Sequence, residues 1–467
     1  MSAISQLPEG TAGKVGSPSL NRRILSATLS VSAAGALVKI AAVCKEIAVA
    51  GVYGRTDAMD AFLAASLVPS LLVNLISESM NQALVPTLVW VREQEGHERA
   101  QQLLSSAMSW MCLLLVAASA AMALTARSFF PLIASHFPAL KLDLSIRLFY
   151  ALLPVVLITG IATNCTAVVN TFERFALPAL APMLISATIL AGALTLGGRM
   201  GIWAMVWSTL AGSLLHAVLM AWMMDRYGYR FSLRWYGMNE ATRTVSRQYG
   251  PVLVSGVVAS GGLLVDQSMA AMLTAGSVSA LVYANRFVSV VLTLVAGAIS
   301  TAVVPYLSRM IAHRDWAGCR ETLRTWVRRT ALLSVPIAVL LIAGSHTIVR
   351  LAYQHGAFRP SDTAVVASVL AMYAIQIPFF VVSRVYYRFL IAMLRTDLIL
   401  WCGVINLGLD VALNLILMRW LGVAGIALAT SLWTVSTFFF LRYWARVVLH
   451  RAVVGDELHR AIGNMNR

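Results

Sequence analysis

Long apolar stretches recur along the whole sequence, and they restrict the possible folds more than any other feature. Each is long enough to cross a lipid bilayer as a helix, and we predict about twelve such spans. A backbone inside a membrane must satisfy its hydrogen bonds internally, which favours helices. The sequence therefore predicts an all-α polytopic membrane protein. The predicted spans are residues 24–53, 59–90, 102–125, 148–170, 175–197, 200–224, 249–274, 277–308, 328–352, 362–385, 389–418 and 421–446.

Positive charge is distributed unevenly between the loops. The formal net charge of +16 is high enough to raise the question of nucleic-acid binding. When the amino terminus is placed in the cytoplasm, the arginine-rich loops at 226–247 and 309–329 both lie on the cytoplasmic side. The basic excess is then a signal of membrane topology. It predicts that both termini are cytoplasmic and that nucleic acid is not a partner.

A polar segment after the sixth predicted span divides the chain into two halves. Pro86 and Pro305 are separated by almost the same number of residues as Arg174 and Arg395, which indicates an internal repeat. Two six-helix lobes in the same orientation are typical of transporters that bind substrate between the lobes. The predicted organisation is a cytoplasmic tail at 1–23, an N-lobe at 24–224, a cytoplasmic linker at 225–248, a C-lobe at 249–446 and a cytoplasmic tail at 447–467.

Three charged residues, Lys39, Lys45 and Glu46, lie within the first span. A charge at membrane depth costs about 2.5 kcal/mol or more, so it usually faces a protein interior or a water-filled cavity. Lys39 and Glu46 are seven positions apart and share a helical face, whereas Lys45 is expected to point elsewhere. Arg286 lies in a leading span of the second half. These cations predict a cavity that accepts an anion, for which a pyrophosphate group is the natural candidate.

Further polar residues inside the spans include Asp60, Glu78 and Asn285. They can line the same cavity, or they can form the ion pairs and interhelical hydrogen bonds that hold a bundle together. Asp60 also follows a turn, where it can cap the second span. The sequence leaves these alternatives open.

A second group of polar residues in the C-lobe is rich in oxygen. Asn406 and Asp410 are four positions apart and share one face of the eleventh span. Asp266 and Thr430 add a carboxylate and a hydroxyl, the ligands that small hard cations prefer. Interhelical hydrogen bonds are an equal alternative from spacing alone. The sequence contains no nucleophile–base pair or phosphate-binding loop, so we predict a transporter rather than an enzyme, and no cofactor beyond a possible sodium ion.

Several motifs are spread in order over nearly the whole chain. They are Lys45-Glu-Ile-Ala-Val-Ala, Thr56-Asp-Ala-Met-Asp60-Ala-Phe, Glu78 to Pro86, Asn170 to Pro182, Gly276-Ser-Val-Ser, Tyr283-Ala-Asn-Arg286 and Gln354-His-Gly-Ala-Phe358. Together they resemble the MurJ/MviN family of lipid II flippases, within the multidrug/oligosaccharidyl-lipid/polysaccharide exporter superfamily. The resemblance implies a flippase that moves an undecaprenyl-pyrophosphate-linked saccharide across the bacterial inner membrane by alternating access.

The resemblance also implies roles for individual residues. The implied substrate-binding residues are Lys39, Lys45, Asp60 and Arg286. The implied supporting residues of the cavity are Glu46, Glu78 and Asn285. A sodium site that some members contain would fall on Asp266, Asn406, Asp410 and Thr430. We expect a monomer surrounded by membrane lipids, with a polyprenyl-pyrophosphate-linked glycan as its partner.

The chain departs from the family pattern in three ways. Lys39 and Lys45 stand where arginine is typical, Val73 stands where a further arginine is typical, and two additional helices are not predicted after the twelfth span. An exopolysaccharide or O-antigen repeat unit is therefore an alternative cargo. A cation-coupled multidrug exporter, which the cavity cations argue against, and a non-transporting scaffold are the remaining alternatives.

Overall fold

The computed structural model describes residues 18–134, 136–172 and 176–465, and every regular element in these residues is a helix. Ten of the helical segments searched are long and apolar enough to cross a membrane, which agrees approximately with the predicted number of spans. The prediction of an all-α polytopic membrane protein is confirmed. Arg174, one landmark of the predicted repeat, lies outside the described residues.

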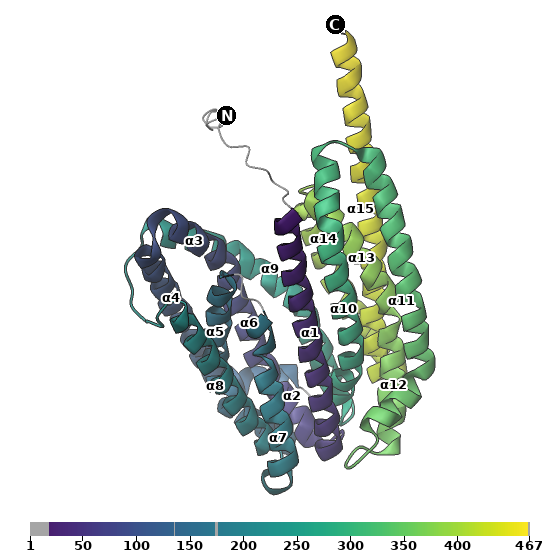
Figure 1. Cartoon of the computed structure of the whole chain (residues 1–467). Coiled ribbons are helices and arrows are strands. Elements are labelled where there is room, and N and C mark those ends of the chain that lie inside the picture. The colour runs from purple at the N-terminus through teal and green to yellow at the C-terminus, as the bar shows by residue number, and fades with distance from the viewer. Residues whose placement is uncertain (1–17, 135, 173–175, 466–467) are drawn as a thin grey trace.

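The first half of the chain forms a helical bundle, the N-lobe (Figure 1). In this bundle α5 packs against α2 and α8, and α7 packs against α8 and α1. The π-helical turn η1 connects α2 to α3 without a loop. The N-lobe helices are α1 (Pro18–Tyr53), α2 (Asp57–Val73), η1 (Asn74–Glu78), α3 (Ser79–Glu95), α4 (His97–Ile133), α5 (Ala139–Asn170), α6 (Ala176–Leu180), α7 (Met183–Met200) and α8 (Trp203–Arg226).

The turn between α1 and α2 is set by its local sequence. Gly54 has a φ of 57°, a left-handed conformation that favours glycine. A Cβ at this position would also lie 2.7 Å from the carbonyl oxygen of Ala357 in the other half of the chain. Thr56 then caps α2 by accepting a hydrogen bond from the Met59 amide. The turn is therefore shaped for close contact with the second half.

The second half forms the C-lobe, in which α10, α12, α13 and α15 pack around one another. The span predicted to end at residue 446 continues to Met465, since no proline interrupts the helix. Most of the predicted carboxyl-terminal tail is therefore an extension of the last helix. Asp456 in this extension forms an ion pair with Arg314 at 3.3 Å. The helices are α10 (Ser277–Ala312), α11 (Trp316–Tyr353), α12 (Pro360–Ala374), α13 (Gln376–Ala392), α14 (Thr396–Leu421) and α15 (Val423–Met465).

One helix, α9 (Glu240–Ala271), connects the lobes and packs against both. Near its start, the Tyr249 hydroxyl donates to the Ile76 carbonyl in η1, whereas Asp266 near its end bonds Asn414 of α14. The linker before it is ordered along α4, where Gln101 exchanges two hydrogen bonds with the backbone of Arg230. The C-lobe predicted to begin at residue 249 therefore starts with a helix shared between lobes.

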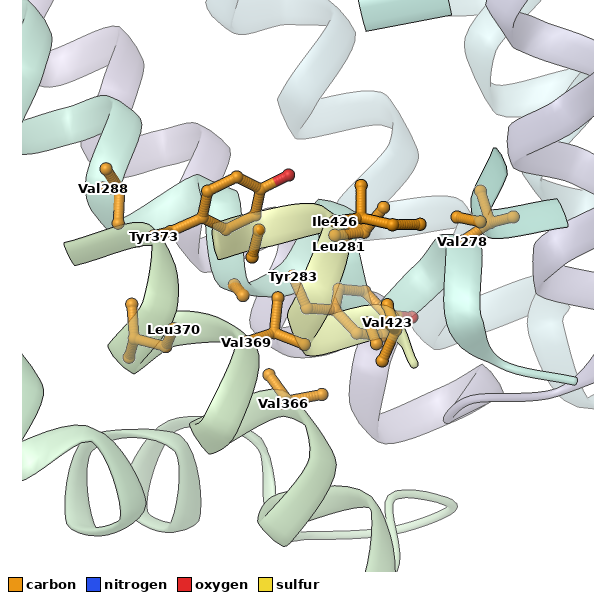
Figure 2. Close-up of a cluster of buried hydrophobic side chains, with 14 of the residues drawn as sticks. Val278, Leu281, Tyr283, Val288, Val366, Val369, Leu370, Tyr373, Val423 and Ile426 are labelled. Atoms are coloured by element: carbon orange, nitrogen blue, oxygen red, sulfur yellow. The ribbon is translucent and has the colours of Figure 1, made fainter. Parts of the chain in front are cut away.

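The lobes meet in an apolar core at the end of the molecule opposite the start of α1 and the end of α15 (Figure 1). Val49 and Tyr53 of α1 belong to the same buried cluster as Tyr283 of α10. Figure 2 shows the C-lobe part of this cluster, where Tyr283, Tyr373 and Ile426 come from α10, α12 and α15. A second buried cluster belongs to the N-lobe and the start of α9. We call the shared end the joined end.

Candidate functional site

A buried carboxylate, Glu46 of α1, binds basic residues from both lobes. Its side chain is 3 % exposed, and its Oε1 lies 2.8 Å from Lys45 Nζ and 2.5 Å from Nη2 of Arg286 on α10. The prediction that Lys45 points away from this face is wrong, because its long, flexible side chain reaches back to the adjacent carboxylate. The structure thus brings Lys45, Glu46 and Arg286 together between the lobes. We call these three residues and Lys39 the cation cluster.

Lys39 supplies a positive charge that no acidic residue among those the structure describes balances. It is partly exposed and lies about two turns before Glu46 on the same face of α1. Within the described part of the chain it has no ion-pair or hydrogen-bond partner. Arg286 also has an unused donor, since its Nε is buried without a hydrogen bond. Three cations and the single carboxylate of Glu46 give the cluster a formal charge of +2, which suits an anion with several oxygens.

Asp60 has a different environment, although it was predicted to share the substrate site. Its carboxylate is fully buried and accepts hydrogen bonds from the Gly276 amide at 2.7 Å and the Ser279 amide at 2.9 Å. Lys141 of α5 lies 3.1 Å from the same carboxylate. Asp60 therefore caps the start of α10 from the opposite lobe. It does not cap α2, as the alternative proposed, because Thr56 holds that position.

Other contacts tie the lobes together around Asp60. The Arg55 guanidinium donates to the Gly276 carbonyl at 2.9 Å and to Asp362 in the first turn of α12 at 3.2 Å. The Ala357 amide donates to the Gly51 carbonyl at 2.7 Å. All of these groups lie at the joined end, which the charge distribution of the loops predicts to be periplasmic. We call this network, with Asp60 and Lys141, the interlobe latch.

The two remaining supporting residues lie in different places. Glu78 is exposed at the end of η1, and no hydrogen-bond or ion-pair partner is found for it among the described residues. Asn285 precedes Arg286 on α10 and lines a C-lobe cavity of about 410 Å³. Asp266 and Asp410 line the same cavity. Asn285 therefore lies between the cation cluster and the acidic residues of the C-lobe.

The predicted oxygen-rich set is largely assembled in this cavity. Asp266 and Asp410 are buried, and the amide nitrogen of Asn414 donates to both, at 2.9 Å and 3.2 Å. The Thr430 hydroxyl donates to the other oxygen of Asp266 at 3.0 Å. Asn406 lines the cavity, but its amide nitrogen donates to Thr437 at 2.7 Å. Asn414, which was not predicted, is thus the amide that joins the two carboxylates.

The residues present fit a small hard cation. Asp410 Oδ2 and Asn414 Oδ1 are both buried acceptors without a hydrogen-bond donor. Two buried carboxylates that share one neutral amide also need positive charge, since an uncompensated buried charge is costly. Oxygen ligands of this kind favour a hard ion over a soft transition metal. The position of Asn414, one helical turn beyond Asp410, was the available signal in the sequence.

Arg384 of α13 is a further intramembrane cation that sequence reasoning missed. It lines a second C-lobe cavity of about 520 Å³, which shares Asn406 and Trp433 with the first. Its guanidinium lies 4.3 Å from the ring centre of Phe380 and 5.6 Å from that of Tyr387. No acidic residue in the described ranges pairs with it. The aromatic rings supply the stabilisation that a carboxylate would otherwise give.

Comparison with known proteins identifies the family. The family profile described as "Lipid II flippase MurJ" matches residues 49–458, which is most of the chain. The chain belongs to the MurJ family. This confirms the resemblance inferred from the motifs, and the match contains every predicted site residue except Lys39, Lys45 and Glu46, which lie just before it.

Relatives in the MurJ family are distant but match over most of their length. The chain is 25 % identical to the lipid II flippase MurJ of Burkholderia cenocepacia, over 75 % of this chain and 70 % of the relative. It is 26 % identical to the probable lipid II flippase MurJ of Thermotoga maritima, over 89 % of this chain and 84 % of the relative. A probable lipid II flippase MurJ of Buchnera aphidicola is 21 % identical over 92 % and 85 %.

Solved structures agree on the fold. A lipid II flippase MurJ in an inward closed conformation superposes with a TM-score of 0.78 at 22 % identity, covering 93 % of this chain and 92 % of that one. An inward-facing multidrug resistance transporter of the MATE family gives 0.74 at 12 % identity, covering 91 % and 98 %. These likenesses confirm the two-lobed helical fold.

Proposed function

We propose that this MurJ family member is a flippase that moves a polyprenyl-pyrophosphate-linked saccharide, with lipid II as the leading cargo, across the bacterial inner membrane. The main observation behind this proposal is the cation cluster at the interface of the lobes. Its three cations exceed the single charge of Glu46 by a formal +2, and Nε of Arg286 has no hydrogen-bond acceptor. Family membership supports the same function. Both termini lie in the cytoplasm in this proposal, so the joined end is periplasmic.

The cation cluster is built to bind a pyrophosphate and to respond to it. Glu46 links Lys45 and Arg286, so it holds α1 and α10 together when no anion is present. A pyrophosphate offers several charged oxygens, which compete with Glu46 for the same donors. The anion can thereby weaken an ion pair that crosses the lobes. Binding then lowers the cost of moving one lobe against the other, as alternating access requires.

A cation bound in the C-lobe would couple to this movement. Asp266 lies on α9, which packs against both lobes, while Asp410 and Asn414 lie on α14. A sodium ion held by these residues and Thr430 would fix the position of α9 relative to the C-lobe. The unpaired oxygens of Asp410 and Asn414 support this assignment. Asn406 lines the cavity and would supply a further oxygen after its amide leaves Thr437.

A second candidate cargo is an exopolysaccharide or O-antigen repeat unit on the same lipid. Position 73 favours it, since Val73 is buried in the second apolar cluster and leaves no cation there. The two cargoes share the pyrophosphate and the lipid, so the cation cluster binds either. They differ only in the groups attached to the pyrophosphate.

Translocation of fluorescent lipid II by the full-length protein in vesicles tests the proposal. We expect Lys45→Ala and Arg286→Ala each to reduce the rate at least tenfold, while Arg419→Ala, at an exposed position in the last turn of α14, leaves it unchanged. Complementation of a strain depleted of its own lipid II flippase distinguishes the cargoes. Growth supports lipid II; failure of growth with active transport of a repeat unit supports the second cargo. Unchanged transport in both cluster variants contradicts the mechanism.

A further inference from the structure

One face of the continuous helix formed by α2, η1 and α3 carries exposed polar side chains at every fourth position. They are Ser70, Asn74, Glu78 and Gln82, which we call the polar stripe. The helix is otherwise well covered, since 67 % of its most apolar window is buried. Among the described residues, the side chains of Asn74, Glu78 and Gln82 have no hydrogen-bond partner. Such groups are costly against lipid, so this face borders a hydrated space.

The π-helical turn η1 keeps the stripe on one face. In an α-helix, each step of four residues advances slightly more than one turn, so a row at this spacing drifts around the helix. A π-turn forms i→i+5 hydrogen bonds and holds more residues per turn. The step from Asn74 to Glu78 lies within η1, so it reverses part of this drift. Turns of this kind are frequent at functional sites.

The neighbours of η1 define the opening that the stripe occupies. On one side, a Cβ on Gly160 of α5 would lie 3.0 Å from the Ser77 hydroxyl. On the other side, a Cβ on Gly256 of α9 would lie 3.4 Å from Leu75. Both neighbours thus pack closely against faces flanking the stripe. The stripe therefore lies on the face of the helix between its contacts with α5 and with α9, the helix that joins the lobes.

The stripe also lies further from the joined end than the cation cluster. At 1.5 Å per residue, Glu46 is about 10 Å from the end of α1, and Arg286 is about 14 Å from the start of α10. Ser70 and Gln82 are about 20 Å and 38 Å from the start of α2. Beyond Gln82 the helix continues to Trp90, which lines a cavity of about 380 Å³. The polar stripe therefore extends from near the level of the cations towards the predicted cytoplasmic side.

We infer that Asn74 and Gln82 bind the saccharide of the pyrophosphate-linked lipid. This inference rests on the proposed function. An amide side chain donates and accepts hydrogen bonds, as sugar hydroxyl and acetamido groups require. A pyrophosphate held by Lys45 and Arg286 places its attached sugar on the open side of the cluster, along the stripe. The cation cluster then recognises what all such lipids share, and the stripe distinguishes lipids with and without a glycan.

Binding of two probes to the full-length protein in lipid nanodiscs tests the inference. The probes are undecaprenyl pyrophosphate without sugar and the same lipid carrying a disaccharide. We expect Asn74→Ala/Gln82→Ala to weaken binding of the disaccharide lipid about tenfold, as the loss of two neutral hydrogen bonds implies, and to change binding of the sugar-free lipid less than twofold. The matched control is Gln94→Ala, an exposed glutamine of the same helix that lies twelve residues beyond Gln82 and about 120° around the helix from it, which should change neither.

The remaining outcomes separate this inference from the function on which it rests. Lys45→Ala should weaken both probes to a similar extent. Equal weakening of both probes by the Asn74/Gln82 double variant, or no weakening of either, overturns the saccharide site while leaving the flippase intact. If the unmodified protein binds neither lipid, the proposed function fails and the saccharide site falls with it.

Discussion

Glu46 and Asp60 are both buried carboxylates that contact the opposite lobe, yet their surroundings differ. Asp60 accepts two backbone hydrogen bonds and a lysine, so its charge is well satisfied. Glu46 is outnumbered by cations, and its partner Arg286 retains an unused donor. The first arrangement is complete without a ligand, whereas the second has a surplus of positive charge. The comparison supports the proposal that the interlobe latch holds the lobes together and that the cation cluster binds an anion.

Burial alone would not have separated the two sites. Glu46 is 2 % exposed and Asp60 is 1 % exposed, so their side chains are equally removed from solvent. What differs is the balance of donors and acceptors around each carboxylate. A satisfied buried group stabilises one conformation, while an unsatisfied one gains from a partner that arrives later.

The largest effect should come from Asp60→Ala. This change leaves Lys141 buried beside Asp57 alone and exposes the start of α10 without its cap. Breaking a buried ion pair by removing one partner costs about 3–5 kcal/mol. We expect a strongly lowered melting temperature of the purified protein in detergent. An unchanged melting temperature would show that the latch does not hold the lobes, and the contrast with Glu46 would disappear.

Glu46→Gln should lower the stability of the protein less than Asp60→Ala does, and it should strengthen anion binding. The amide still accepts a hydrogen bond, so we expect a loss of about 1–3 kcal/mol. The formal charge of the cluster rises to +3, so inorganic pyrophosphate should raise the melting temperature more than in the unmodified protein. Lys45→Ala is the control in which this rise shrinks. If pyrophosphate stabilises neither protein, the cluster is structural like the latch.

Asn414→Ala tests whether the unpaired oxygens beside Asp266 and Asp410 form a binding site for a cation. Sodium at ten times its dissociation constant should stabilise the unmodified protein by about 1.4 kcal/mol relative to choline, measured as a shift in melting temperature. The variant should lose most of this shift, and Asn406→Ala should lose less. A full sodium response in Asn414→Ala would remove this residue from the cation site.

The smallest effect is expected for Asp57→Ala, the matched control for Asp60. Asp57 Oδ1 lies 2.7 Å from Lys141 Nζ, closer than Asp60, but its side chain is 59 % exposed. Exposed ion pairs contribute less than about 1 kcal/mol because solvent screens them. The melting temperature should therefore fall only slightly. A loss as large as that of Asp60→Ala would show that contact with Lys141, rather than burial and helix capping, gives the latch its strength.

Much of the candidate site follows from the cost of placing charge in a membrane. That cost predicted that Lys39, Glu46 and Arg286 face a shared interior, and the structure places Glu46 in contact with Arg286. The sequence could not predict that Lys45 turns back to Glu46, because a flexible side chain is not fixed by the direction of its Cβ.

Other contacts depended on pairings across the fold. Lys141 was predicted to lie in a loop between spans, and only the packing of α5 against α2 brings it to Asp60. The amide that joins Asp266 and Asp410 belongs to Asn414 rather than Asn406, although both are four positions from Asp410 on the same helix. The sequence gives no means of choosing between them, since the choice depends on where α9 crosses α14.

By itself, the sequence determined that the chain is helical, that it spans a membrane, and that its buried charges need partners. These conclusions rest on local rules, because lipid offers no hydrogen bonds to a backbone and no hydration to a charge. Only the tertiary structure decided which carboxylate is satisfied and which is left with surplus cations. The contacts of Arg286 with Glu46 and of Gly276 with Asp60 join residues far apart in the chain, so they depend on how the lobes pack, and no local pattern records that packing.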